Sequence, residues 1–219
     1  MKCKYLPLAF GLLLAAVTCI PSLAQQVAAK EEGWILLFDG KSFDGWTVSK
    51  ENPNTFKLED GAFVANGPRA HLYYTGPVNG ATFKNFELKV DVMTRKSSNG
   101  GIYFHTRYLE SGWPDKGFEV QVNNSYDRDP RRTGSLYMMQ DVNQVPVPDD
   151  EWFTEHIIVK DKRVMVRVND KTVVDWTEPV PPQPPRNAPG RVLGEGTFAL
   201  QGHDPGSTVY YKNIRVKPE

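Results

Sequence analysis

The sequence predicts an all-β protein, an antiparallel β-sandwich built as a single domain. Apolar and polar residues alternate with a period of two in many short segments, and turn-forming residues separate these segments. No segment of ordinary length shows the period of an amphipathic helix. Short strands joined by turns are typical of an antiparallel sandwich rather than of an α/β fold.

The first 24 residues are expected to form an export signal. Two lysines precede an apolar run over residues 6–20, and small residues of the kind that a signal peptidase requires end at Ala24. The run is shorter than the about 20 residues of a transmembrane helix, so we expect no transmembrane segment in the mature chain. We therefore predict a signal peptide over residues 1–24 and a periplasmic or extracellular protein.

Both cysteines, Cys3 and Cys19, lie within this segment. Retention of Cys19 as a lipidated N-terminus is an alternative, but the residues before it match a lipoprotein signal poorly. Cleavage after Ala24 would leave a mature chain without a disulfide or a thiol nucleophile. It would also leave 24 basic and 26 acidic residues, and the resulting net charge of −2 is not typical of a nucleic-acid-binding protein.

The mature chain is expected to consist of a short linker over residues 25–32 and one sandwich domain over residues 33–219. Within the domain, six prolines crowd residues 178–190. Prolines cannot donate to a sheet ladder and favour extended backbone, so we expect a long surface loop here. The loop either walls one side of a cleft or, as we favour, only crosses stiffly between the two sheets.

The clearest predicted strand covers residues 86–93, in which apolar residues occupy the even positions. Asn169-Asp170 predicts a tight hairpin, because Asn and Asp tolerate left-handed backbone angles, and Asp161-Lys162 is expected to close the hairpin before it. Further strands are predicted at residues 102–108, 118–123, 156–160, 163–168, 172–176, 197–201 and 208–216.

Three polar residues stand in a row on the predicted strand 118–123. Its apolar residues share one face, which leaves Glu119, Gln121 and Asn123 on the other. Carboxylate and amide groups about 7 Å apart along a strand suit the hydroxyl-rich face of a sugar, because they donate and accept hydrogen bonds. An outer sheet face that is merely polar is the alternative interpretation.

The preceding predicted strand adds polar groups to this row. By alternation, Tyr103, His105 and Arg107 fall on one face of residues 102–108. If the two strands are neighbours, His105 and Arg107 lie beside Glu119 on an open surface, which would bring a base, an acid and a cation together.

Loops and turns contain weaker candidates. Tyr137 and His203 lie at strand ends or turns, where ligand contacts concentrate. Trp113 lies in the loop before the Glu119 strand, where it could stack on a pyranose ring or pack at a rim. The four histidines lack the spacing of a zinc site, although ligands from distant strands leave a divalent metal ion open.

Four segments together carry a family resemblance: Leu37–Trp46, Asn99–His105, Phe118–Gln121 and Leu200–His203. With them, the chain from Trp34 to Val216 resembles the 3-keto-disaccharide hydrolase family, formerly a domain of unknown function, which has a concanavalin-like jelly-roll sandwich. The sequence departs from the commoner family pattern at His105, where many relatives have Arg, and at Gly100, where Ser is usual.

The resemblance implies an enzyme that acts on glycosides whose glucose unit is oxidised to a ketone at carbon three. The ketone acidifies the neighbouring C–H bond, so one base suffices for β-elimination of the glycosidic oxygen, and addition of water completes a net hydrolysis. Glu119 and His105 are then the candidates for proton transfer. The residues expected to hold the oxidised glycoside or disaccharide are Asn99, Arg107, Trp113, Gln121, Asn123, Tyr137 and His203.

Three other functions remain open at this level. A non-catalytic carbohydrate-binding module of the bacterial envelope would use the same polar strand face. A retaining glycosidase needs two carboxylates about 5 Å apart, whereas strand 118–123 supplies one. A scaffold domain of an envelope complex would need an exposed apolar patch. The sequence does not determine the exact sugar, the choice between elimination and direct hydrolysis, or the oligomeric state.

Overall fold

The computed structural model describes Met1 and residues 33–144 and 147–219. The predicted signal peptide, the linker and Cys19 lie outside the described residues, apart from Met1. Gly33–Glu219 forms one compact unit. No helix in these described ranges is long and apolar enough to cross a membrane.

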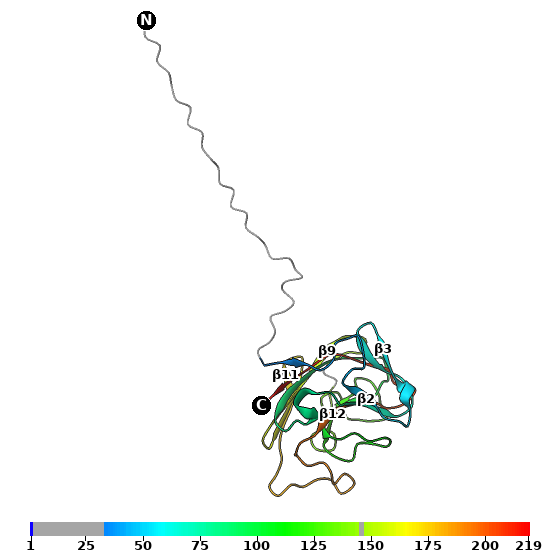
Figure 1. The fold of residues 1–219 in the computed structure, drawn as a ribbon. Coiled ribbons are helices and arrows are strands. Elements are labelled where there is room, and N and C mark those ends of the chain that lie inside the picture. Colours follow the sequence, from blue (N-terminus) through cyan, green and yellow to red (C-terminus); the bar gives the residue numbers. More distant parts are fainter. Residues whose placement is uncertain (2–32, 145–146) are drawn as a thin grey trace. The chain divides into compact units, whose positions relative to one another are not determined.

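The unit consists of two antiparallel sheets, as the sequence predicts (Figure 1). Hydrogen-bonded neighbours in the smaller sheet run in the order β2 (Trp46–Val48), β5 (Ala70–Tyr74), β12 (Thr197–Gly202), β7 (Gly100–Thr106) and β8 (Phe118–Val122). The larger sheet runs in the order β11 (Lys171–Thr177), β10 (Arg163–Val168), β9 (Phe153–Lys160), β6 (Phe86–Thr94), β13 (Val209–Pro218), β4 (Ala62–Ala65) and β3 (Phe56–Glu59), and β1 (Ile35–Leu36) pairs with β13. Two short 3-10 helices, η2 (Pro53–Thr55) and η3 (Val78–Ala81), lie between strands.

The core lies between the sheets and follows from the alternation seen in the sequence. Along β6 the even-numbered residues are buried and the odd-numbered ones are partly exposed. At one end of this strand, the ring centroid of Phe86 lies 4.9 Å from that of Phe198 and 5.8 Å from that of Phe104, both on the smaller sheet. Such aromatic contacts join the inner faces of the two sheets.

The turn predictions are confirmed for the hairpins of the larger sheet. Asn169 and Asp170, between β10 and β11, have φ angles of 45° and 61°, and Asp161, between β9 and β10, has a φ of 53°. The strands before residue 86 were not predicted. β1 and β2 have only two and three residues, and β4 is apolar at every position, so none of the three shows an alternation of apolar and polar residues. The Asp60-Gly61 turn between β3 and β4, with φ angles of 47° and 75°, was nevertheless a readable hairpin signal.

The outward face of the smaller sheet is not an open surface. Every residue of β7, β8 and β12 is buried, although only one face of these strands packs on the core. Tyr108 and Leu109, in the loop after β7, pack on the outward residues Tyr73, Tyr103 and Ala199. The predicted polar row therefore lies in a covered pocket, where charges are poorly solvated.

Candidate functional site

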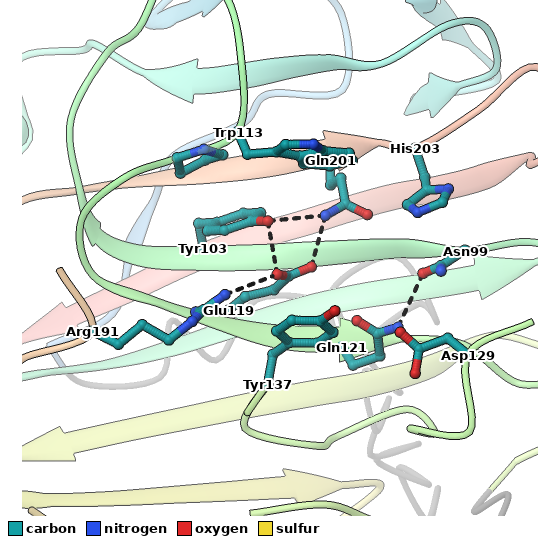
Figure 2. Close-up of a pocket in the computed structure, with 11 residues that line it drawn as sticks. Asn99, Tyr103, Trp113, Glu119, Gln121, Asp129, Tyr137, Arg191, Gln201 and His203 are labelled. Carbon is teal, nitrogen blue, oxygen red and sulfur yellow. Dashed lines mark hydrogen bonds and ion pairs between the residues drawn. The ribbon is translucent and has the colours of Figure 1, made fainter. Parts of the chain in front are cut away.

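A cavity of about 220 Å³ lies on the outward face of the smaller sheet (Figure 2). Its floor comes from β7, β8 and β12, and its walls come from the loops that follow β7, β8, β11 and β12 and from Asn99, just before β7. The lining residues are Asn99, Tyr103, Trp113, Pro114, Glu119, Gln121, Asp129, Tyr137, Arg191, Gln201 and His203.

Glu119 is the buried carboxylate of this cavity, with 4% of its surface exposed. One oxygen accepts a hydrogen bond of 2.7 Å from the hydroxyl of Tyr103, and the other accepts one of 2.7 Å from the amide of Gln201. A guanidinium nitrogen of Arg191 lies 3.5 Å from the first oxygen. Burial raises the pKa of Glu119, and this effect outweighs the lowering by Arg191, Tyr103 and Gln201.

The strand register brings these groups together. Glu119 on β8 pairs with Tyr103 on β7, and Tyr103 pairs with Ala199 on β12, two residues before Gln201. Gly101 leaves space for the carboxylate, since a Cβ there would lie 2.6 Å from Oε1 of Glu119. A residue with a side chain at position 101 would therefore displace the acid.

Two amides extend the polar floor beyond Glu119. The Gln121 side chain donates a hydrogen bond of 3.1 Å to Oδ1 of Asn99. Oε1 of Gln201 is buried and accepts no hydrogen bond from any described residue. Buried acceptors are normally paired, so this oxygen is available to a ligand hydroxyl or to water.

Two guanidinium groups flank Tyr137 at one wall. The backbone NH of Tyr137 donates to the carbonyl of Glu119 at 2.9 Å, which fixes the ring beside the carboxylate. The guanidinium carbons of Arg131 and Arg191 lie 4.6 and 5.2 Å from the centre of that ring. Burial raises the pKa of Tyr137 and, with the nearby carboxylates of Asp129 and Glu119, outweighs the opposite effect of the two arginines.

Trp113 forms the rim of the cavity and is 45% exposed. The guanidinium of Arg69 lies 5.2 Å from its ring centre, and Arg69 is ion-paired with Glu51 at 2.8 Å. Glu51 also accepts a hydrogen bond from the backbone NH of Gly112, so one carboxylate anchors both the loop and the cation that covers the indole.

Arg191 directly follows the proline-rich segment, which crosses from β11 to β12. The carbonyl of Gly190 accepts a hydrogen bond of 3.0 Å from the NH of Gly117, and a Cβ at Gly190 would lie 1.9 Å from the carbonyl oxygen of Asp115. The crossover thus contacts the Trp113 loop backbone to backbone. Its end also walls the cavity, which the sequence interpretation had ranked second.

His203 lies at the end of the cavity away from Arg191 (Figure 2). Its Nδ1 is 2.7 Å from Oδ2 of Asp204, and its ring centre is 5.7 Å from that of Trp113. Oδ2 of Asp204 also accepts a hydrogen bond of 2.8 Å from the hydroxyl of Ser207. The ring is therefore held by a carboxylate that is itself held in place.

The expectation that His105 lies beside Glu119 is wrong. His105 has a φ of 55° at a shift in the β7–β12 register, and this bulge breaks the alternation of the strand. Its ring packs on Phe86 and Phe104, with Nε2 2.8 Å from the carbonyl of Lys84. Burial lowers the pKa of His105 to about 4, and the residue lies outside the cavity lining.

Two further predicted site residues also lie outside the cavity lining. Arg107 is exposed and ion-paired with Asp115 at 2.6 Å. The Asn123 amide donates to the carbonyls of Tyr126, Asp129 and Arg131 at 2.9–3.1 Å, so it organises the loop that brings Asp129 to the cavity. Asn123 therefore does not line the cavity and bears on the site only through the loop that contains Asp129.

The structure brings together six of the nine predicted site residues: Asn99, Trp113, Glu119, Gln121, Tyr137 and His203. Sequence reasoning did not select Tyr103, Asp129, Arg191 or Gln201. Alternation had placed Tyr103 on the correct face, and Gln201 lies in a segment used for the family resemblance. Asp129 and Arg191 come from loops, where the sequence has no periodicity that would show which way a side chain points.

No group of three or more metal-binding side chains occurs in the described ranges 33–144 and 147–219.

Comparison with known proteins gives a consistent family. A model described as the 3-keto-alpha-glucoside-1,2-lyase-like domain matches residues 33–217. A 3-keto-disaccharide hydrolase of Bacteroides thetaiotaomicron is 27% identical over 236 residues, covering 88% of this chain and 80% of the relative.

Solved structures match the fold. A candidate glycosyl hydrolase from Parabacteroides distasonis has a TM-score of 0.70 at 22% identity, covering 91% of this chain and 98% of that chain. The carbohydrate binding module CBM66 from Bacillus subtilis has a TM-score of 0.56 at 14% identity, covering 78% and 95%. The predicted lectin-like sandwich fold is thereby confirmed.

Proposed function

Because the chain belongs to the family of 3-keto-alpha-glucoside-1,2-lyase-like domains, we propose that it cleaves 3-keto-glycosides by elimination and hydration, with Glu119 as the base. The observation that carries this proposal is the buried Glu119 carboxylate at the cavity floor, held by Tyr103, Gln201 and Arg191. A group fixed on three sides is oriented for proton transfer before the substrate enters.

The raised pKa of Glu119 suits this role. A base is most effective when its pKa lies close to the working pH, because it then removes a proton more readily than an ordinary carboxylate does. The proton on carbon two of a 3-keto-sugar is acidified by the adjacent carbonyl. Glu119 and Asp129 are the two carboxylates of the lining, and each is paired with an arginine, Glu119 with Arg191 at 3.5 Å and Asp129 with Arg131 at 3.2 Å. An elimination needs only one carboxylate as the base, whereas a retaining glycosidase needs two carboxylates about 5 Å apart.

The size of the cavity supports a substrate of one enclosed sugar unit. Its volume of about 220 Å³ is below the about 300–1,000 Å³ that is usual for sites of drug-sized ligands. The oxidised pyranose would fill the polar floor. The leaving group would then extend past Trp113, whose half-exposed indole offers an apolar face to a second ring.

The test uses purified protein and a p-nitrophenyl glucoside oxidised at carbon three. We expect release of p-nitrophenol from this substrate and none from the unoxidised glucoside. Glu119→Gln is expected to lower turnover about 10²- to 10⁴-fold, the usual contribution of a positioned base, while binding is retained. Binding without turnover by the wild-type protein would instead support a carbohydrate-binding module.

We also propose that the protein is exported, because of the lysines, the apolar run and the small residues that end at Ala24. Mass spectrometry of the protein secreted by a bacterial host would check this. We expect a mature chain that begins at Gln25.

A further inference from the structure

We infer that His203, oriented by Asp204, is the second proton-transfer group of the site: it protonates the leaving oxygen and then deprotonates the attacking water. This inference rests on the proposed function. Glu119 handles only the proton on carbon two, so an elimination and a hydration both need a second group near carbon one.

The hydrogen bonds around His203 fix its tautomer. Nδ1 donates to Oδ2 of Asp204 at 2.7 Å, which leaves Nε2 as the nitrogen that exchanges a proton with a ligand. Asp204 accepts further hydrogen bonds from the Ser207 hydroxyl and from the NH of Gly206, both at 2.8 Å. Although burial raises the pKa of Asp204, these hydrogen bonds and that from His203 outweigh it, so the carboxylate stays ionised.

The same cluster is tied to the floor of the cavity. The hydroxyl of Ser207 accepts a hydrogen bond of 2.9 Å from the backbone NH of Asn99, a lining residue. A carboxylate that holds a histidine in one tautomer is the arrangement by which hydrolases orient a proton-transfer group.

The position of His203 matches the required role. Figure 2 shows the carboxylate of Glu119 between Arg191 on one side and His203 on the other, with the amide oxygen of Gln201 pointing to the side of His203. That oxygen is the unpaired buried acceptor of the site. A water molecule there would donate one hydrogen to Oε1 of Gln201 and the other to Nε2 of His203, which would hold its oxygen for attack.

Glu119 takes the proton from carbon two, and the electron pair moves through the enolate of the ketone to form the C1–C2 double bond. The C1–O bond breaks, and the leaving oxygen takes the proton of the His203 imidazolium. Water then adds to carbon one and gives a proton to the imidazole, and the carboxylic acid of Glu119 returns its proton to carbon two.

Other lining groups fit this role less well. The Asp129 carboxylate is held by the guanidinium and the backbone NH of Arg131. The phenol of Tyr137 has a raised pKa, chiefly because of burial, so it is a weaker acid than an imidazolium.

The test compares two substrates that share the oxidised sugar. p-Nitrophenolate leaves without a proton, whereas methoxide needs one. His203→Gln is therefore expected to lower kcat/KM about 10²- to 10⁴-fold for the 3-keto methyl glucoside and far less for the p-nitrophenyl glucoside. Glu119→Gln should lower both alike. Asp204→Asn should follow the His203→Gln pattern, because it replaces the charged acceptor of Nδ1 with a neutral amide, whose NH2 group can donate to Nδ1 and favour the other tautomer.

Two further measurements distinguish catalysis from structure. With the p-nitrophenyl substrate, His203→Gln should accumulate the unsaturated ketone, seen by its ultraviolet absorbance, because hydration is slowed. Added imidazole should restore cleavage of the methyl glucoside by His203→Ala. Equal losses on both substrates, with no unsaturated ketone and no rescue, would overturn the assignment. Failure of the wild-type protein on both substrates would instead refute the proposed function.

Discussion

The substitution Gly101→Ala tests whether the position of the Glu119 carboxylate, rather than its mere presence, determines the rate. A Cβ at residue 101 would lie 2.6 Å from Oε1 of Glu119. An ordinary contact begins at 3.4 Å, so Oε1 must withdraw by about 0.8 Å. A shift of that size directed away from Gln201 would lengthen the 2.7 Å hydrogen bond to about 3.5 Å, beyond the useful range, and this gives the upper limit of the effect.

The expected loss follows from that bond. A hydrogen bond to a charged group contributes about 1.5–3 kcal/mol. At about 1.4 kcal/mol for each factor of ten, its loss predicts a fall in kcat/KM of about 10- to 140-fold. The assay is the initial rate of p-nitrophenol release from the 3-keto glucoside.

Gly100→Ala is the matched control. Its Cβ would lie 2.7 Å from the hydroxyl of Tyr211, a core residue, and not near the carboxylate of Glu119. Overpacking there should cost about 1–3 kcal/mol of stability and leave kcat/KM of the folded protein intact. Wild-type kcat/KM in Gly101→Ala, or an equal loss in Gly100→Ala, would refute this reasoning.

Three further substitutions give separate outcomes. Burial raises the pKa of Glu155 well above its ordinary value of 4.5, so folding favours its protonated form and stability falls as the pH rises from 4.5 toward the raised value. In thermal unfolding, Glu155→Gln should therefore stabilise the protein at pH 8 and not at pH 4. An unchanged pH profile would contradict this. Asn123→Ala removes an NH2 group whose two hydrogens are shared among three loop carbonyls, so chemical denaturation should show a loss of at least about 2 kcal/mol, with a raised KM from the displaced Asp129. Unchanged stability would count against its role in the loop. His105→Ala should lose about 1–3 kcal/mol of stability but keep its kcat. Loss of turnover in a folded variant would indicate that His105 takes part in the reaction.

The sequence was informative wherever one face of a strand is solvated. Alternation in β6 and the Asn169-Asp170 turn follow directly from local chemistry, and they predicted the sandwich. Alternation in the sequence also placed Glu119 and Gln121 on a common face of their strand. Alternation failed at His105, because one residue with a left-handed backbone reverses the facing of all that follow it.

The remaining site residues depend on contacts that span long stretches of sequence. Gln201 meets Glu119 across 82 residues, and Arg191 reaches it from a crossover without regular structure. Such contacts are set by how loops close over the sheet, which no local pattern encodes. For Asn123 the sequence predicted the correct face of the strand but not the role, since its amide donates a hydrogen bond to the following loop and not to the cavity.

The backbone contact at Gly190 joins two loops that wall the cavity from different directions. With no side chain between Gly190 and Asp115, there is no compressible layer to absorb a displacement of either loop. Under the proposed function, a leaving group that displaces Trp113 would also displace the segment that ends at Arg191, and with it the cation beside Glu119. We therefore expect the size of the aglycone to affect the rate through the base as well as through binding.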